Sequence, residues 1–304
     1  MTPVVHFQDS DMAANFPVRP FAIRHDLTGH PLFSLPRLIQ LANSLDRDRI
    51  EYNSGDLEPG QRPEDTPKVG LPVDETIRRI EECHAWMVLK RVELDPDYRN
   101  LLDLCIKSLV DAAGPNAEPV LDVRGFIFIS SANSVTPFHV DPEQNFLLQI
   151  RGEKFMHVFD NDDRSLVSDE ALEIDHNRHR NLHYEESFEE RATVFRMNPG
   201  DGVFVPYLAP HWVRTGDDYC VSIAVTWRTP EVLRQNKIRF ADAMLRKVGL
   251  PQPGPGRSRV LDAVKVAAVD TAEMIATPLR QSERTRRLVR RIAFGRRANY
   301  YYEA

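Results

Sequence analysis

Three side chains of metal-ligand type stand in two short segments of the sequence. His139 and Asp141 occur two residues apart in T-P-F-H-V-D, and His211 occurs about 70 residues later in V-P-Y-L-A-P-H-W-V. Because side chains two positions apart on a strand point to the same face, His139 and Asp141 can chelate one ion. His211 follows a strand-like run and a proline turn, where a β-barrel could return it to the first pair. The spacing indicates a site of two imidazoles and one carboxylate.

Such a ligand set suits octahedral Fe(II). It fills one face of the octahedron and leaves three positions open for a chelating 2-oxoacid and for dioxygen. An H-x-D pair also occurs by chance, so the alternative for His211 is a hydrogen-bonded histidine in the core or at the rim. The residues around the motif decide between the two interpretations.

The surrounding sequence resembles the core of the JmjC-type hydroxylases, which are Fe(II)- and 2-oxoglutarate-dependent dioxygenases with a cupin barrel. The segment S-V-T-P-F-H-V-D-P-E-Q-N-F-L-L-Q-I-R-G-E-K carries the first half of the likeness. The segment N-P-G-D-G-V-F-V-P-Y-L-A-P-H-W-V is similar to that family's turn, strand and distal histidine. Within the family, the first segment most resembles the asparaginyl hydroxylase that acts on hypoxia-inducible factor. The likeness covers residues 121–228 and assigns no role outside them.

The resemblance implies that the triad binds Fe(II) and that Thr136, Asn145 and Lys154 hold 2-oxoglutarate. Lys154 opens a strand after a hairpin turn, so its ammonium could reach into a barrel, where a buried cation needs an anionic partner. A solvated hairpin lysine is the alternative. Thr226 stands where the asparaginyl hydroxylase has an asparagine, so we expect it in the cosubstrate pocket with altered contacts.

The elements that must position these residues follow from hydrophobic periodicity. Short β-like runs separated by turns fill residues 121–230, which is typical of an antiparallel sandwich or barrel. Helical spacing marks residues 31–46 and 97–112 and the stretch after Pro230. We therefore predict a mainly β fold, with a double-stranded β-helix of jelly-roll or cupin type and flanking helices at both ends.

The domain organisation predicted from these patterns has three parts. A helical and mixed region over residues 1–120 packs on a JmjC-like barrel over residues 121–230, and basic C-terminal helices occupy residues 231–304. Residues 54–71 are rich in Pro, Gly and charge, which indicates a surface loop or lid.

The composition argues against a disordered or fibrous protein. Hydrophobic residues make up 42% and charged residues 28%, an ordinary balance for a globular protein. The net charge of -6 provides no overall positive field for nucleic acid or membranes. The sequence has three cysteines and no apolar run long enough to span a bilayer. We expect a cytoplasmic protein without disulfides or a membrane span.

Basic charge is concentrated near the C-terminus, where residues 251–304 hold eleven Lys or Arg against five Asp or Glu. This segment could contact nucleic acid, an acidic membrane surface or an acidic partner. The apolar residues Leu288, Ile292 and Phe294 favour the alternative, a helix that closes a homodimer or flanks the barrel.

Two further groups of residues have both functional and structural interpretations. His176, His179 and His183 could form a second metal site, but their irregular spacing favours a surface insert. Trp212 and Trp227 could line a substrate groove, although tryptophans beside strands more often lie in the core.

The function predicted from the sequence is oxidation of a C–H bond with conversion of 2-oxoglutarate to succinate and CO2. The resemblance implies hydroxylation of a protein side chain, while a small-molecule substrate and N-demethylation remain open. One alternative is a non-catalytic cupin-like protein with a metal or ligand pocket and a basic tail that contacts nucleic acid or a partner. Another is a metal-dependent cupin that does not use 2-oxoglutarate.

Overall fold

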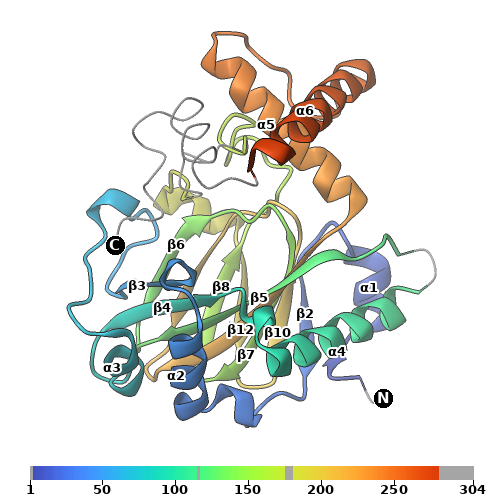
Figure 1. Ribbon diagram of the computed structural model, residues 1–304. Coiled ribbons are helices and arrows are strands. Elements are labelled where there is room, and N and C mark those ends of the chain that lie inside the picture. Colours follow the sequence, from blue (N-terminus) through green and yellow to red (C-terminus); the bar gives the residue numbers. More distant parts are fainter. Residues whose placement is uncertain (1–2, 115–116, 175–180, 281–304) are drawn as a thin grey trace. The chain divides into compact units, whose positions relative to one another are not determined.

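The computed structural model describes residues 3–114, 117–174 and 181–280 (Figure 1). The chain forms two compact units. Of the described residues, the first unit comprises 3–114, 117–167 and 181–230, and the second comprises 168–174 and 231–280.

Two antiparallel sheets form the first unit. The larger sheet has eight strands in the order β1-β2-β10-β7-β12-β5-β4-β3, and the smaller has four in the order β6-β11-β8-β9. The strands of the larger sheet are β1 (Val5–His6), β2 (Phe21–His25), β3 (Ile50–Ser54), β4 (Ala85–Lys90), β5 (Leu121–Ser130), β7 (Gln144–Arg151), β10 (Asp201–Val205) and β12 (Cys220–Arg228). Those of the smaller sheet are β6 (Val135–His139), β8 (Lys154–Val158), β9 (Thr193–Met197) and β11 (His211–Thr215). The predicted mainly β fold with flanking helices is confirmed.

The N-terminal segment contributes β1 to β4 to the larger sheet, two at each edge. In β2, for example, Phe21, Ile23 and His25 are buried while Ala22 and Arg24 are exposed, the alternation of a strand with one covered face. Residues 1–120 thus extend the sheet as well as packing helices on it.

Helices cover the outer face of the larger sheet (Figure 1). They are α1 (Asp9–Asn15), α2 (Leu35–Ser44), α3 (Val73–Arg78) and α4 (Pro96–Ala113). The helix predicted over residues 31–46 occurs as a 3-10 turn, Pro31–Phe33, followed by α2. Leu38 and Leu41 of α2 and Tyr98 and Leu102 of α4 join the main apolar core, which fixes the helices against the sheet.

A second, smaller apolar cluster lies between the inner faces of the two sheets. Its members come from both sheets and include Leu147, Met156, Val205, Val213 and Ala224. Because strand residues alternate between faces, the polar residues that share these inner faces point into the same gap.

The segment over residues 54–71 is attached to β6. The amides of Val135 and Phe138 donate to the carbonyls of Gly55 and Pro59 at 2.9 and 2.8 Å. The segment therefore pairs with the outer edge of the strand that carries His139, and β6 is not left as an open edge.

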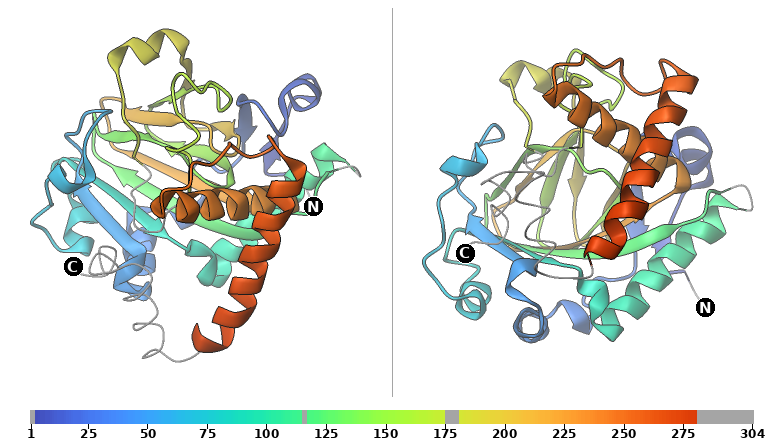
Figure 2. Two further views of the ribbon diagram at one scale, coloured as in Figure 1. Left: turned by 90° about the horizontal axis from the view of Figure 1, so that it is seen from above. Right: turned by 45° about the horizontal axis from the view of Figure 1, so that its top comes forward.

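The second unit contains α5 (Pro230–Lys247) and α6 (Arg259–Arg280), which cross each other in Figure 2. Polar pairs join them: Lys265 Nζ lies 2.5 Å from Asp242 Oδ1, and Lys237 pairs with Asp270. Within the described residues, no helix is both long and apolar enough to cross a membrane.

Candidate metal centre

The predicted metal ligands come together at one end of the gap between the sheets. His139 ends β6 and His211 begins β11, where they are cross-strand partners with ring centroids 4.1 Å apart. Asp141 follows β6, and its Oδ2 lies 3.8 Å from His211 Nε2. One ligand atom from each residue lies within 4.8 Å of the others. Two metal–ligand bonds of about 2.0–2.2 Å reach up to about 4.4 Å, which covers the 3.8 Å between Asp141 Oδ2 and His211 Nε2.

Backbone hydrogen bonds determine which nitrogen of each histidine faces the ion. His139 Nδ1 lies 2.7 Å from the Pro137 carbonyl, and His211 Nδ1 lies 2.9 Å from the Ala209 carbonyl. A carbonyl only accepts, so each Nδ1 carries the proton and each Nε2 keeps its lone pair. The hydrogen bond at each Nδ1 fixes the orientation of that ring, so that its Nε2 can serve as the metal ligand.

Burial keeps His211 in the form that binds metals. Its side chain is 4% exposed, and burial, followed by the proximity of His139, lowers its pKa to about 4. The imidazole is therefore neutral near pH 7 and available as a ligand.

Lys154 lies deep between the sheets, at the opposite end of the same gap. It is 4% exposed, its Nζ donates to Ser222 Oγ at 2.5 Å, and it lies 5.7 Å from the ring centroid of Phe128. No carboxylate of the described residues forms an ion pair with it. Burial lowers the pKa of Lys154 to about 8. Because Lys154 is buried, the alternative interpretation of it as a solvated lysine in a hairpin is excluded.

Asn145 and Thr226 lie on neighbouring strands as cross-strand partners. Each is buried, and Asn145 Oδ1 and Thr226 Oγ1 have no hydrogen-bond partner within the described part of the chain. Buried polar atoms are rarely left unpaired, so each unpaired atom suggests a missing partner such as a ligand.

Thr136 is hydrogen-bonded to a tryptophan of the larger sheet. Its hydroxyl accepts a hydrogen bond from Trp86 Nε1 at 2.9 Å, and no direct contact joins it to Lys154 among the described side chains. Trp86 and Ser222 are thus two pocket residues that the sequence interpretation missed. For Ser222 a signal existed, because alternation along β12 places it on the same face as Thr226.

Other residues singled out in the sequence lie away from the triad. Trp227 is 1% exposed in the main core, and Trp212 is 8% exposed and stacked on His157, so neither lines an open groove. His183 is exposed beside Glu185. Two further sets lie outside the described residues: His176 and His179, and the stripe Leu288, Ile292 and Phe294.

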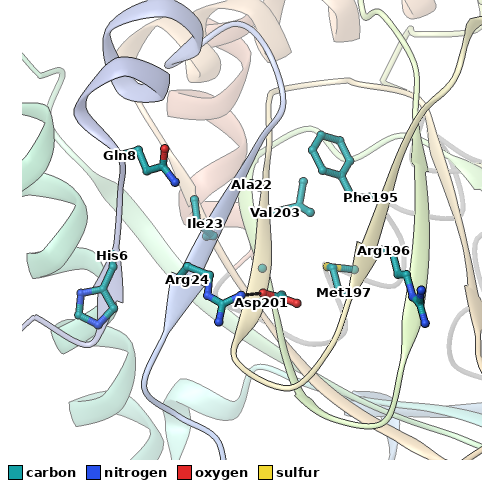
Figure 3. A pocket seen from close by; sticks show the side chains of 11 residues that line it. His6, Gln8, Ala22, Ile23, Arg24, Phe195, Arg196, Met197, Asp201 and Val203 are labelled. Carbon is teal, nitrogen blue, oxygen red and sulfur yellow. Dashed lines mark hydrogen bonds and ion pairs between the residues drawn. The ribbon is translucent and has the colours of Figure 1, made fainter.

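A cavity of about 190 Å³ lies between β2, β10 and β9 (Figure 3). Phe195 and Met197 from β9 and Ile23 from β2 contribute apolar lining, and the Arg24–Asp201 ion pair lies on one side. Its lining includes no predicted metal or cosubstrate residue, so the cavity is separate from the metal centre.

The donor set fits a divalent ion of the Fe(II) type because it combines two imidazoles and a carboxylate on adjoining segments. The residues that face the gap also suit a dicarboxylate: the buried Lys154 ammonium lies at one end, and Asn145 Oδ1 and Thr226 Oγ1 have no hydrogen-bond partner among the described residues.

The fold and the triad define a metal-binding β-sandwich of cupin type. The chain belongs to the cupin-like domain family, whose model matches residues 74–231. This confirms the recognition of a cupin-like protein, while the narrower likeness to the asparaginyl hydroxylase stays a prediction.

Solved structures of the Escherichia coli protein YcfD are similar in fold. One is 16% identical over 94% of this chain and 71% of that chain, with a TM-score of 0.50. A structure described as the ribosomal oxygenase YcfD is 14% identical over 94% and 70%, with a TM-score of 0.48. A complex of YcfD with cobalt and 2-oxoglutarate is 14% identical over 91% and 69%, with a TM-score of 0.49.

Proposed function

We propose that the protein is an Fe(II)- and 2-oxoglutarate-dependent oxygenase. One observation carries the proposal: the His139–Asp141–His211 cluster and the buried Lys154 lie at two ends of one gap between the sheets. Lys154 pairs with Thr215, four residues along β11 from His211, which is a rise of roughly 13 Å. An extended lysine side chain together with a five-carbon dicarboxylate can bridge that interval.

Each residue has one role in this proposal. His139, Asp141 and His211 hold Fe(II), which supplies a centre where dioxygen oxidises both 2-oxoglutarate, to succinate and CO2, and a substrate C–H bond. Lys154 and Ser222 bind the far carboxylate, and Asn145 and Thr226 supply polar contacts along the pocket wall. Thr136 accepts a hydrogen bond from Trp86 Nε1 and keeps its own hydroxyl proton, which it donates to the far carboxylate of 2-oxoglutarate in this proposal. The apolar residues between these groups exclude water.

We propose a protein side chain as the substrate class, which follows from the resemblance of the barrel motifs to protein hydroxylases. The E. coli neighbour is itself described as a ribosomal oxygenase. A small-molecule substrate is the second candidate.

The cytoplasmic location of the protein also stays a prediction, to be checked by cell fractionation.

The decisive experiment measures 2-oxoglutarate binding and slow succinate release. The protein is loaded anaerobically with Fe(II) and then exposed to oxygen, and His139→Ala serves as the test variant. His183→Ala is the matched control, because His183 is an exposed histidine outside the triad. Succinate release that requires His139 but not His183 supports the proposal. Metal binding without 2-oxoglutarate affinity would favour a cupin without this cosubstrate, or a binding protein.

A homodimer through α6 is our proposal for the second unit. Val260, Val264 and Met274 are 74%, 60% and 71% exposed, and their spacing fits a heptad pattern. The charged side chains Asp262 and Lys265 are instead buried in the unit. The helix therefore presents its apolar side outward, which suits a second copy of the same helix.

Size-exclusion chromatography with light scattering tests this assembly. Val264→Glu is expected to convert a dimer to a monomer, while Arg259→Glu, which adds a carboxylate to α6 outside the stripe, is expected to leave the dimer intact. A wild-type monomer at micromolar concentration would contradict the proposal.

A further inference from the structure

The residues adjacent to the two ligand histidines are buried on the outer face of the smaller sheet. Phe138 precedes His139 and Trp212 follows His211, and strand alternation turns both away from the metal. Phe138 is 0% exposed and Trp212 is 8% exposed. The segment over residues 181–191, which includes the 3-10 helix η5 (Glu186–Arg191), supplies the cover. We call this segment the strap.

Glu189 joins the strap to two strands through one carboxylate. Its Oε1 accepts from Trp212 Nε1 at 2.6 Å and from Tyr184 OH at 2.7 Å, and its Oε2 lies 2.7 Å from His157 Nδ1. Trp212 belongs to β11 and His157 to β8, and their rings are stacked 3.9 Å apart. Hydrogen bonds to a carboxylate are about twice as strong as neutral ones, so this contact restrains both strands.

The strap also contacts β6, the strand of the other histidine. The Leu182 amide donates to the Phe138 carbonyl at 2.8 Å. The rings of Tyr184 and Phe188 lie 5.6 and 6.2 Å from that of Phe138. One short segment therefore connects β6, β11 and β8 from outside.

This external contact matters because the backbone ladder is irregular at the metal end. Pairing between β6 and β11 shifts register between His211 and Val213, next to the pair His211–His139. A register shift removes regular ladder bonds locally. The distance between the two histidines is then determined less by the backbone and more by what packs against the strands.

We propose that Glu189 is a positioning residue for the metal centre, which holds Trp212 and thereby His211 at the spacing from His139 that a single ion requires. The inference rests on the proposed function. Residues that orient metal ligands from outside typically contribute 10–100-fold to metal affinity. Glu189 does so through the neighbouring residue of the ligand, without touching the ion.

The test compares Co(II) affinity, the visible absorption spectrum of the Co(II) form and thermal unfolding across matched variants. Glu189→Ala is expected to weaken Co(II) binding by about 10-fold or more and to alter the spectrum. Glu189→Gln keeps an oxygen that accepts from Trp212, so it is expected to restore most of the affinity. Glu153→Ala is the control, because Glu153 is a carboxylate of similar exposure that binds Arg196 on the same sheet.

The outcomes separate the inference from the proposed function. If the wild-type protein binds neither Co(II) nor 2-oxoglutarate, both fail. If the wild type binds both, and Glu189→Ala matches Glu153→Ala in affinity and spectrum, the positioning role is wrong and the contact is only structural. Should Glu189→Ala not fold, Trp212→Phe removes the indole donor and keeps an aromatic ring beside His157. Unchanged Co(II) affinity and spectrum in Trp212→Phe would then overturn the inference.

Discussion

Lys154 Nζ lies 2.5 Å from Ser222 Oγ, so the buried ammonium is hydrogen-bonded to a neutral hydroxyl. An isolated buried charge is costly, and in the described part of the chain no carboxylate forms an ion pair with this one. A dicarboxylate bound in the gap would supply the missing negative charge. The lysine is therefore both a source of instability in the free protein and a source of affinity for the ligand.

Lys154→Met tests both consequences. We expect the affinity for 2-oxoglutarate to fall by about 30-fold or more, since losing one partner of a buried charge pair costs about 2 kcal/mol or more. We expect the ligand-free protein to melt at a higher temperature, because an apolar side chain replaces a buried charge. Calorimetry of 2-oxoglutarate binding and thermal unfolding check the two effects. Co(II) affinity is the control and should not change, whereas unchanged 2-oxoglutarate affinity would contradict the role of Lys154.

The lowered pKa of Lys154 predicts how 2-oxoglutarate binding depends on pH. Below pH 8 the lysine of the free protein is already charged, so affinity should be flat. Above pH 8 the neutral lysine must take up a proton when the carboxylate binds, so affinity should fall by up to about tenfold per pH unit. Calorimetry in buffers of different ionisation enthalpy measures this uptake. We expect almost none at pH 7 and nearly one proton at pH 9, and equal uptake at both pH values would refute the explanation.

His25 predicts a separate pH effect on stability. Its Nε2 donates to the Gln149 carbonyl at 3.0 Å, and its Nδ1 accepts from the Leu27 amide at 3.1 Å, which requires the neutral ring. Burial lowers its pKa below 6.5, against the opposing effects of Asp201 and Asp26. Below pH 6.5 the unfolded state therefore binds more protons than the folded state. The contribution of His25 to the free energy of unfolding is complete above pH 6.5 and is lost as the pH falls through the folded pKa.

Urea unfolding at pH 7.5 and 5.5 measures the effect of His25. The wild type is expected to lose more stability on acidification than His25→Gln, by up to about 1.4 kcal/mol for one pH unit. Other groups titrate in both proteins, so only the difference between them reports on His25. Equal losses would show that the ring is not held neutral.

The grouping of His139, Asp141 and His211 was predictable because the first two are local neighbours and because the segment around His211 resembles that of the family's distal histidine. A strand period of two aligns His139 with Asp141, and the turn before His211 marks where the chain returns. Lys154 was predictable for a similar reason, because the turn containing Gly152 opens β8. Gly152 has a φ of +74°, and a Cβ there would lie 2.5 Å from the Tyr219 carbonyl, so the hairpin requires glycine.

The remaining contacts of the site are long-range and left no local pattern. Trp86 reaches Thr136 across 50 positions, and Lys154 reaches Ser222 across 68. Glu189 lies in an insert whose polar composition predicts only a loop, and its partners are recognised only after the sheet is folded. The surface loop or lid expected over residues 54–71 forms backbone hydrogen bonds to β6. The sequence did not predict these bonds, because pairing between distant segments has no sequence period.

Thr226 offers a test in which stability and affinity change in opposite directions. Its Oγ1 is buried and has no hydrogen-bond partner among the residues that the structure describes. Thr226→Val removes this hydroxyl and should stabilise the ligand-free protein by about 1 kcal/mol. If that hydroxyl binds 2-oxoglutarate, the same change should weaken the ligand by about tenfold, as expected for a hydrogen bond to a charged group. Thermal unfolding and calorimetry measure the two effects.

Thr215→Val is the matched control for this experiment. The Thr215 hydroxyl is also buried, but it donates to the Ser131 carbonyl at 2.7 Å and accepts from the Ser134 amide at 2.8 Å. Its loss should therefore destabilise the protein, because two backbone groups lose their partner. If Thr226→Val behaved like Thr215→Val and left 2-oxoglutarate binding intact, the hydroxyl would be part of the packing between β12 and β7. Of the two contacts proposed here along the gap, that of Asn145 would then remain.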